Sequence, residues 1–190
     1  MPGLGGRTIG KLGATAVLMG GPDILTSLAS GAIDAAEWIC PVADLGLGMH
    51  QAAKFYYGPG WHEPSTLLDL SIDLKEWEGL DADTQALMME MAKAFNVDVF
   101  SRFQALNGPA LGKLLNEHGV QLKTFPDELL IALGNAAGEV MEERGSIDSQ
   151  TKAICNHILS FRKNIMDWST KGESEFARIR NLPFKFPDSV

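Results

Sequence analysis

The sequence predicts an α/β protein with a helix-rich C-terminal half. The first part of the chain, to about residue 72, is rich in Gly and Pro and alternates short segments, which is typical of α/β structure. Beyond residue 73, apolar residues recur at helical spacing over long segments. With 190 residues the chain is long enough to bury a sizeable core, so we expect one compact unit or one lobe of a two-lobed protein.

The first elements are short and separated by glycines. A helix is expected over 7–12, followed by an apolar run over 14–19. A second helix begins near Pro22, whose missing N–H costs nothing in a first turn, and ends at Gly31. A strand is then expected over 33–38.

The next segment carries turn residues between short apolar runs. We expect a short helix over 43–54, a strand over 55–57 that is broken by Gly58-Pro59-Gly60, and a further strand over 65–72.

From Asp73 the pattern is helical. Asp73 and Asp83 are expected to cap two successive helices. The second helix is expected to be amphipathic, to run to about His118 and to kink at Gly108-Pro109. Its apolar residues at helical spacing are Leu87, Met91, Phe95, Val99, Phe103 and Leu106. The methionines in this helix are expected to fill the core.

The last part of the chain is expected to hold one short strand and three helices. The strand spans 120–125, and the helices span 127–144, 149–168 and 173–180.

Composition excludes several classes of protein. The hydrophobic fraction of 45% and charged fraction of 21% are those of a globular protein, and no run approaches the roughly 18 apolar residues that a membrane span needs. A net charge of −8, with basic residues scattered, makes nucleic acid an unsuitable partner. Cys40 and Cys155 form no paired motif, so both are expected to be small buried residues.

The sequence contains only incomplete versions of the usual catalytic motifs. Gly3-Leu4-Gly5 begins a dinucleotide-binding pattern, but Thr8 occupies the third glycine position. His62-Glu63 begins a zinc-protease pattern that Pro64 would break. The other histidines, His50, His118 and His157, are expected on helix surfaces as solvated or half-buried residues.

Two segments combine carboxylates with aromatic rings where strands are expected to end: 34–38 and 56–64. Glu37 on a buried strand needs a partner, because an unpaired buried carboxylate is costly. A hard cation held by Glu37, the Trp38 carbonyl and Glu63 would supply that partner. The alternatives are a surface salt bridge for the carboxylates and core positions for the tryptophans.

These segments, together with Pro2-Gly3-Leu4-Gly5-Gly6, resemble the DctP-type solute-binding proteins of TRAP transporters, especially the branch that binds 2-oxo acids and related monocarboxylates. The central ligand strand of the family matches 31–38, and its aromatic loop matches 56–64. The resemblance continues more weakly through Trp77, the long helix and Phe125-Pro126, so it covers most of the chain.

The resemblance implies part of a two-lobed fold like that of the type II periplasmic binding proteins. Residues 1–190 would be its C-terminal portion, with the N-terminal lobe and the signal peptide absent. The family's carboxylate-clamping Arg lies just before the Pro-Gly turn, where this chain has Met1.

The resemblance also implies roles for residues. Glu37, Trp38 and Glu63 would bind a bridging cation, either sodium or calcium, while Trp38, Tyr57 and Glu37 would bind the organic acid. The protein would act in the periplasm and deliver its ligand to the TRAP membrane permease subunits, without catalysis. An exposed half-cleft would favour a homodimer or pairing with a complementing N-terminal lobe.

Two other functions remain open from the sequence. The helical C-terminal half could mediate oligomerisation or another interaction. A carboxylate-based enzyme acting on oxo acids would use Glu37 or Glu63 as general base and His62 as acid.

Overall fold

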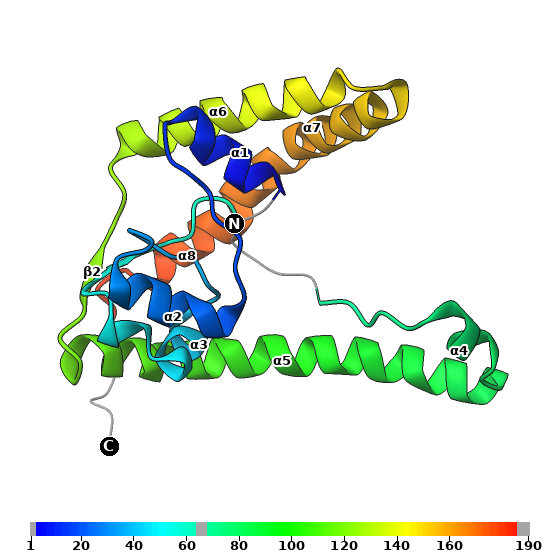
Figure 1. The fold of residues 1–190 in the computed structure, drawn as a ribbon, viewed down its shortest axis with the longest axis horizontal. Helices are drawn as coiled ribbons and strands as arrows, with labels where there is room; N and C mark the ends of the chain where they lie inside the picture. The colour runs from blue at the N-terminus through cyan, green and yellow to red at the C-terminus, as the bar shows by residue number, and fades with distance from the viewer. Residues whose placement is uncertain (1–2, 64–67, 186–190) are drawn as a thin grey trace. The chain divides into compact units, whose positions relative to one another are not determined.

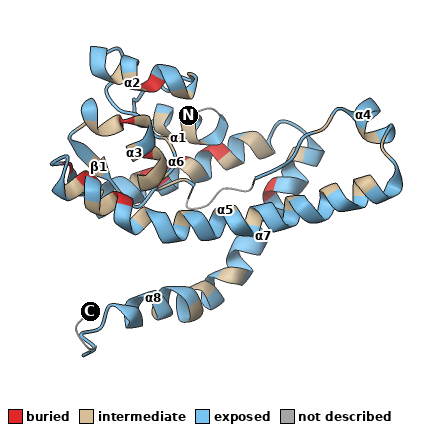
Figure 2. Ribbon diagram, turned by 90° about the horizontal axis from the view of Figure 1, so that it is seen from below, coloured by how far each residue is buried: buried red, intermediate tan, exposed pale blue. Residues whose placement is uncertain are grey.

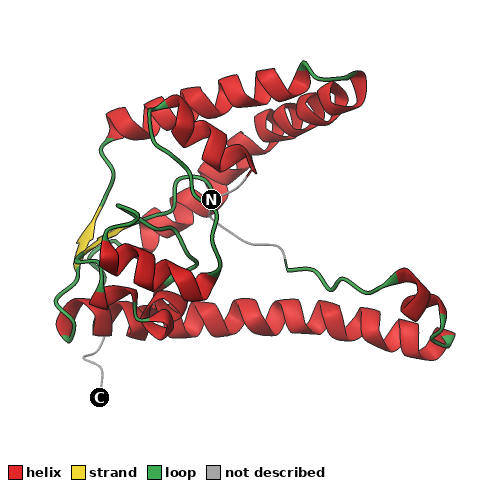
Figure 3. Ribbon diagram, viewed as in Figure 1, coloured by secondary structure: helices red, strands yellow, loops and turns green. Residues whose placement is uncertain are grey.

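The computed structural model describes residues 3–63 and 68–185, and helices predominate (Figure 1, Figure 3). By its internal contacts the chain divides into two units, Met1–Leu133 and Gly134–Val190. Residues Met1, Pro2 and Pro64, which belong to the expected motifs, lie outside the described residues.

The first unit begins with two short helices. Helix α1 spans Gly3–Lys11 and helix α2 spans Gly21–Ser30. Pro22 lies in the first turn of α2, and Gly31 ends it with a φ of 73° while donating its N–H to Leu28. The expected second helix is confirmed at both ends.

The strand expected over 33–38 is not formed. Residues 35–38 have no regular secondary structure, and the sheet among the described residues contains only strands β1 and β2. The described part of the strand expected over 65–72, residues 68–72, is not a strand either, and the rest of it lies outside the described residues.

A short parallel pair forms the sheet. Strand β1, Phe55–Tyr57, pairs with β2, Gln121–Lys123, so that Phe55 lies beside Gln121. Backbone hydrogen bonds extend the pair at both ends: Gln121 N–H to the Lys54 carbonyl, 2.8 Å, and Gly58 N–H to the Lys123 carbonyl, 3.0 Å. Both short strands expected here are confirmed.

Helix α3, Pro41–Leu47, and the 3-10 turn η1, Met49–Gln51, replace the single helix expected over 43–54. Gly48 separates them because its φ of 77° ends α3. Helix α3 packs against α5, and the Val42 N–H donates to Asn107 Oδ1 at 3.1 Å.

Helices α4, Leu74–Glu78, and α5, Ala82–Asn116, follow. Asp73 caps α4 as expected, accepting from two backbone N–H groups. The cap expected at Asp83 is wrong: Asp81 caps α5 and accepts from the Thr84 N–H at 2.9 Å, because Asp83 already lies inside the first turn. Helix α5 is one helix that contains Pro109.

The expectation that the methionines of α5 fill the core is wrong. Met91 is 62% exposed and Met89 is 54% exposed, and only Ala110 and Leu114 of this helix are buried. Figure 2 shows α5 as mostly exposed or intermediate along its length. The physical reason is that α3, the helix that packs against it, contains only 7 residues and α5 contains 35.

Helix α6, Asp127–Gly145, leads into the second unit. There α7, Ser149–Ser169, begins at the Asp148 cap and continues through a π-helical turn η2, Thr170–Ser174, into α8, Glu175–Arg180. These helices agree with the expected ranges to within a few residues. None of the helices in the described residues combines the length and apolar character of a membrane span.

Candidate functional site

The segment that carries Glu37 and Trp38 is held against the start of α2. A Cβ atom placed on Gly21 would lie 2.6 Å from Trp38 Cη2, so the indole lies directly against the Gly21 backbone. This contact requires glycine, since any side chain would displace the ring. The Glu37 side chain stays 42% exposed, so it is not the buried strand carboxylate that the sequence predicted.

The second segment follows β1. The chain passes through a cis Gly58-Pro59 peptide and reaches Trp61 and His62, whose rings lie 4.7 Å apart with a 44° tilt. The next residue, Glu63, is exposed. Both tryptophans, Trp38 and Trp61, are half-buried rather than core residues.

The two segments meet at His62. Its Nε2 lies 3.9 Å from Glu37 Oε2, and its side chain is only 10% exposed. Both ring nitrogens of His62 are buried, and neither has a hydrogen-bond partner among the described residues. The structure therefore places Glu37 beside the loop that carries Glu63.

Buried Asp44 ties these segments together. Its Oδ2 accepts from the Tyr56 hydroxyl at 2.6 Å, and its Oδ1 accepts from the Ile39 N–H at 3.4 Å. One bond reaches the residue after Trp38, and the other reaches the middle of β1. Asp44 thus links the segment that carries Glu37 to the strand that leads to Glu63.

Burial raises the pKa values of both Asp44 and Tyr56. Desolvation raises the pKa of Asp44, while the bonds from Tyr56 and Ile39 oppose that rise. Desolvation and the neighbouring carboxylate raise the pKa of Tyr56 well above its ordinary value. Sequence reasoning missed Asp44. Its only signal was an Asp inside an otherwise apolar helical segment, 12 residues before a strand Tyr.

Tyr57 stands beside the same loop. Its ring stacks on Phe125, with centroids 4.9 Å apart and a 19° angle between the planes, and it remains 48% exposed. One face of Tyr57 is thus occupied by Phe125, and the exposed part is free to contact a ligand.

The donors in this region suit a hard cation. Carboxylate and carbonyl oxygens are the ligands that sodium-like and calcium-like ions prefer, and Glu37, Glu63 and the Trp38 carbonyl are of this kind. The described residues contain no group of three or more His, Cys, Asp or Glu side chains arranged as a complete metal site.

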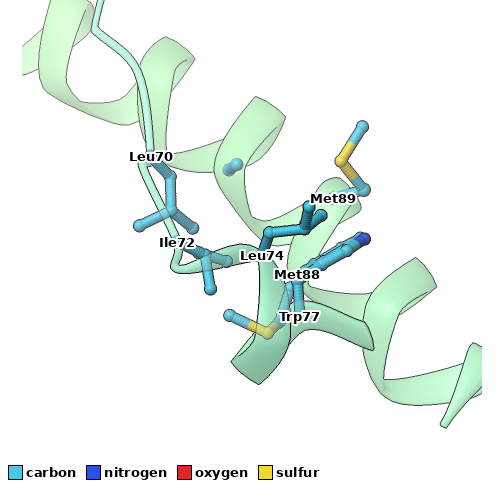
Figure 4. Close-up of a pocket in the computed structure, with 7 residues that line it drawn as sticks. Leu70, Ile72, Leu74, Trp77, Met88 and Met89 are labelled. Atoms are coloured by element: carbon cyan, nitrogen blue, oxygen red, sulfur yellow. The ribbon is translucent and has the colours of Figure 1, made fainter. Parts of the chain in front are cut away.

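A separate pocket of about 360 Å³ lies between α4, α5 and the segment before them (Figure 4). It is lined by Leu70, Ile72, Leu74, Trp77, Met88, Met89 and Ala92. Because no charged or hydrogen-bonding side chain except Trp77 lines it, this pocket does not suit a carboxylate.

The remaining histidines and cysteines have no role in the candidate site. His50 is half-buried and stacks on His118, with ring centroids 3.9 Å apart, while His157 is exposed on α7. Cys155 is buried as expected, but Cys40 is only half-buried.

Comparison with known proteins gives a consistent result. Residues 2–146 match the family model DctP, described as bacterial extracellular solute-binding protein, family 7. The chain is 35% identical over 176 residues to a monocarboxylate 2-oxoacid-binding periplasmic protein of a Nostoc species. That match covers 93% of this chain and 48% of the relative.

Solved structures of TRAP periplasmic solute-binding proteins share the fold. A protein from Colwellia psychrerythraea with bound calcium and pyruvate has a TM-score of 0.86 at 30% identity, over 94% of this chain and 54% of that one. A protein from Pseudoalteromonas atlantica with bound sodium and pyruvate has a TM-score of 0.87 at 29% identity. The match covers 97% of this chain and 55% of that one. The chain thus spans about half the length of these proteins.

Proposed function

Because the chain belongs to the bacterial extracellular solute-binding proteins of family 7, we propose that it forms part of a TRAP receptor for a small organic acid anion. The ligand class is a 2-oxo acid or a similar monocarboxylate, bound together with sodium or calcium. The observation that carries this proposal is the meeting of the Glu37 segment and the Glu63 loop at His62. The bound pyruvate and cations of the related structures support it.

The oxygen donors would hold the cation. Glu37 and Glu63 supply negative charge, and the Trp38 carbonyl supplies a neutral donor. A bound cation would place positive charge next to the ligand carboxylate and so offset the repulsion of a chain with a net charge of −8. Gly21 and Asp44 keep the backbone around these donors in place.

The aromatic side chains would contact the organic part of the ligand. Trp38 is fixed against Gly21, and Tyr57 is fixed by its stacking on Phe125. Both rings keep exposed surface, so they can bury an apolar group without losing their own packing.

Capture and release without covalent chemistry is the activity that the family supports. The chain would work in the periplasm and pass its ligand to TRAP membrane permease subunits. The enzyme alternative is less well supported, because the family and the relatives that match are solute-binding proteins.

Part of the surface of this chain would contact the remainder of the receptor. Leu87, Met91 and Phe95 follow one side of α5 at four-residue spacing, and each is at least 60% exposed. Val97 and Phe100, 68% and 61% exposed, lie on another side. A helix that is apolar on several sides is normally buried. We assign this surface, together with the pocket beside Trp77, to contact with the half of the related proteins that these matches do not cover.

Co-expression tests this assignment. The chain should form a one-to-one complex with the unmatched half of the Nostoc relative, seen by size exclusion with light scattering. Phe95→Asp should abolish the complex, and Phe161→Asp, at an equally exposed position on α7, should leave it intact. A monodisperse chain that ignores the added half would contradict the assignment.

Ligand titration tests the function itself. Pyruvate should quench tryptophan fluorescence in a saturable manner, and only with calcium or sodium present. Glu37→Gln and Glu63→Gln should each weaken cation binding at least about tenfold, because ligand charge sets the affinity of such sites. Glu78→Gln, an exposed position on α4, is the matched control. Equal affinity with and without the cation would overturn the proposal.

A further inference from the structure

His62 presents two buried polar atoms for which the described residues provide no hydrogen bond. Its side chain is 10% exposed, and both Nδ1 and Nε2 are shielded from solvent. An imidazole always carries at least one N–H donor, and burying that donor without an acceptor costs stability. The position of this ring therefore calls for a partner at one of its nitrogens.

Glu37 is the group that faces the ring. Its Oε2 lies 3.9 Å from Nε2, a few tenths of an ångström beyond hydrogen-bond range, and its side chain is 42% exposed. The ring itself is restrained, because Trp61 lies against it at 4.7 Å. A small rotation of the exposed carboxylate, rather than of the restrained ring, closes the gap.

We propose that His62 is a positioning residue for Glu37. Its Nε2–H donates to Oε2, which fixes the carboxylate rotamer and leaves Oε1 turned towards the cation. The cation part of this statement rests on the proposed function, whereas the hydrogen bond does not. Such outer contacts orient ligands in metal sites and determine a large part of their affinity.

The position of His62 in the chain gives this contact a second consequence. His62 directly precedes Glu63, so a bond from its ring to Glu37 joins the two carboxylate-bearing segments at the site itself. Asp44 joins the same segments from the buried side through Ile39 and Tyr56. The two donors of negative charge are thereby held as one unit before any cation arrives.

The first test reads the ring directly and needs no cation. Long-range nitrogen–proton NMR of the wild-type chain at about pH 8, where an ordinary histidine is neutral, should show His62 protonated at Nε2. Glu37→Ala should shift the Nε2 resonance, and the exposed neighbour variant Asp34→Ala should not. Protonation at Nδ1, or an Nε2 resonance that ignores Glu37→Ala, overturns the proposal.

The second test uses calcium alone as the probe. Gln can place its amide N–H close to the position of Nε2, so His62→Gln should keep calcium affinity within about threefold, whereas His62→Phe should lose about 10-fold to 100-fold. Equal affinity of His62→Phe and wild type would contradict a positioning role. Should calcium fail to bind both the wild-type chain and its assembly with the unmatched half of the Nostoc relative, while the Nε2 signal depends on Glu37, the hydrogen bond stands and the cation function falls.

Discussion

At the scale of single residues, a buried acid organises the site. Asp44 is only 7% exposed. One of its carboxylate oxygens accepts a hydrogen bond from the backbone N–H after Trp38, and the other accepts one from the Tyr56 hydroxyl. Sequence reasoning proposed Glu37, Trp38, Tyr57 and Glu63 as site residues, because carboxylates beside tryptophans are unusual and the family motif is specific. It could not find Asp44, because its role depends on a contact with a residue 12 positions away, which no periodicity shows.

The first residue-scale prediction concerns Tyr56. Tyr56→Phe removes the hydroxyl and leaves Asp44 Oδ2 buried without its donor, so the free energy of unfolding should fall by about 1–3 kcal/mol. Urea unfolding followed by circular dichroism measures it. Tyr57→Phe is the matched control, since that ring is 48% exposed, and its stability should stay within about 0.5 kcal/mol of wild type. Similar losses in both variants would count against the Asp44 bridge.

The second residue-scale prediction concerns how the stability of the protein depends on pH. Burial raises the pKa of Asp44 in the folded protein above its unfolded value, so the native state binds its proton more tightly. Its contribution to stability is fully present below the ordinary carboxyl pKa, about 3.9, and is lost as pH rises through the folded pKa. The stability of wild type relative to Asp44→Asn should therefore decrease as pH rises above about 4. Unfolding measured over a pH series checks the sign, and an increase would show that the two hydrogen bonds outweigh burial.

At the scale of elements, helices were predictable, but the strands expected over 33–38 and 65–72 were not found among the described residues. The first-turn proline and the glycine stop of α2 and the Asp73 cap of α4 are local signals, and the structure confirms them. The composition of segment 33–38 predicts a strand, but strand formation needs a partner that sequence patterns do not supply. The apolar spacing of α5 correctly predicts a helix, while the extent of its exposure depends on what packs against it.

Contact between α2 and the site segment gives the element-scale prediction. Gly21→Ala would place a Cβ 2.6 Å from Trp38 Cη2, so the ring or the start of α2 must move. We expect a loss of about 1–3 kcal/mol, as in other overpacked sites, with a shift of the tryptophan emission. Thermal unfolding and fluorescence measure both effects.

Gly46→Ala is the control for that prediction. Its Cβ would meet no atom within 4 Å, and Gly46 lies in α3. This variant should gain about 0.5–1 kcal/mol, since Ala favours helix over Gly. Unchanged stability and emission in Gly21→Ala would mean that Trp38 does not rest on α2.

At the scale of the molecule, the fold places the chain among the bacterial extracellular solute-binding proteins of family 7. Its fold matches solved TRAP solute-binding proteins over nearly its whole length and over about half of theirs. The family was predictable from three ordered motifs. The exposed apolar sides of α5 were visible only in three dimensions, because exposure depends on what packs against a helix.

Calorimetric titration of pyruvate into the chain assembled with the unmatched half of the Nostoc relative tests the central claim most directly. With calcium present, binding should be saturable at one pyruvate per assembly, and a chelator should abolish it. Glu37→Ala should remove the calcium-dependent heat, and Glu78→Ala should leave it unchanged. Pyruvate binding that persists at full strength with the chelator, or in Glu37→Ala, would contradict a cation-bridged carboxylate site.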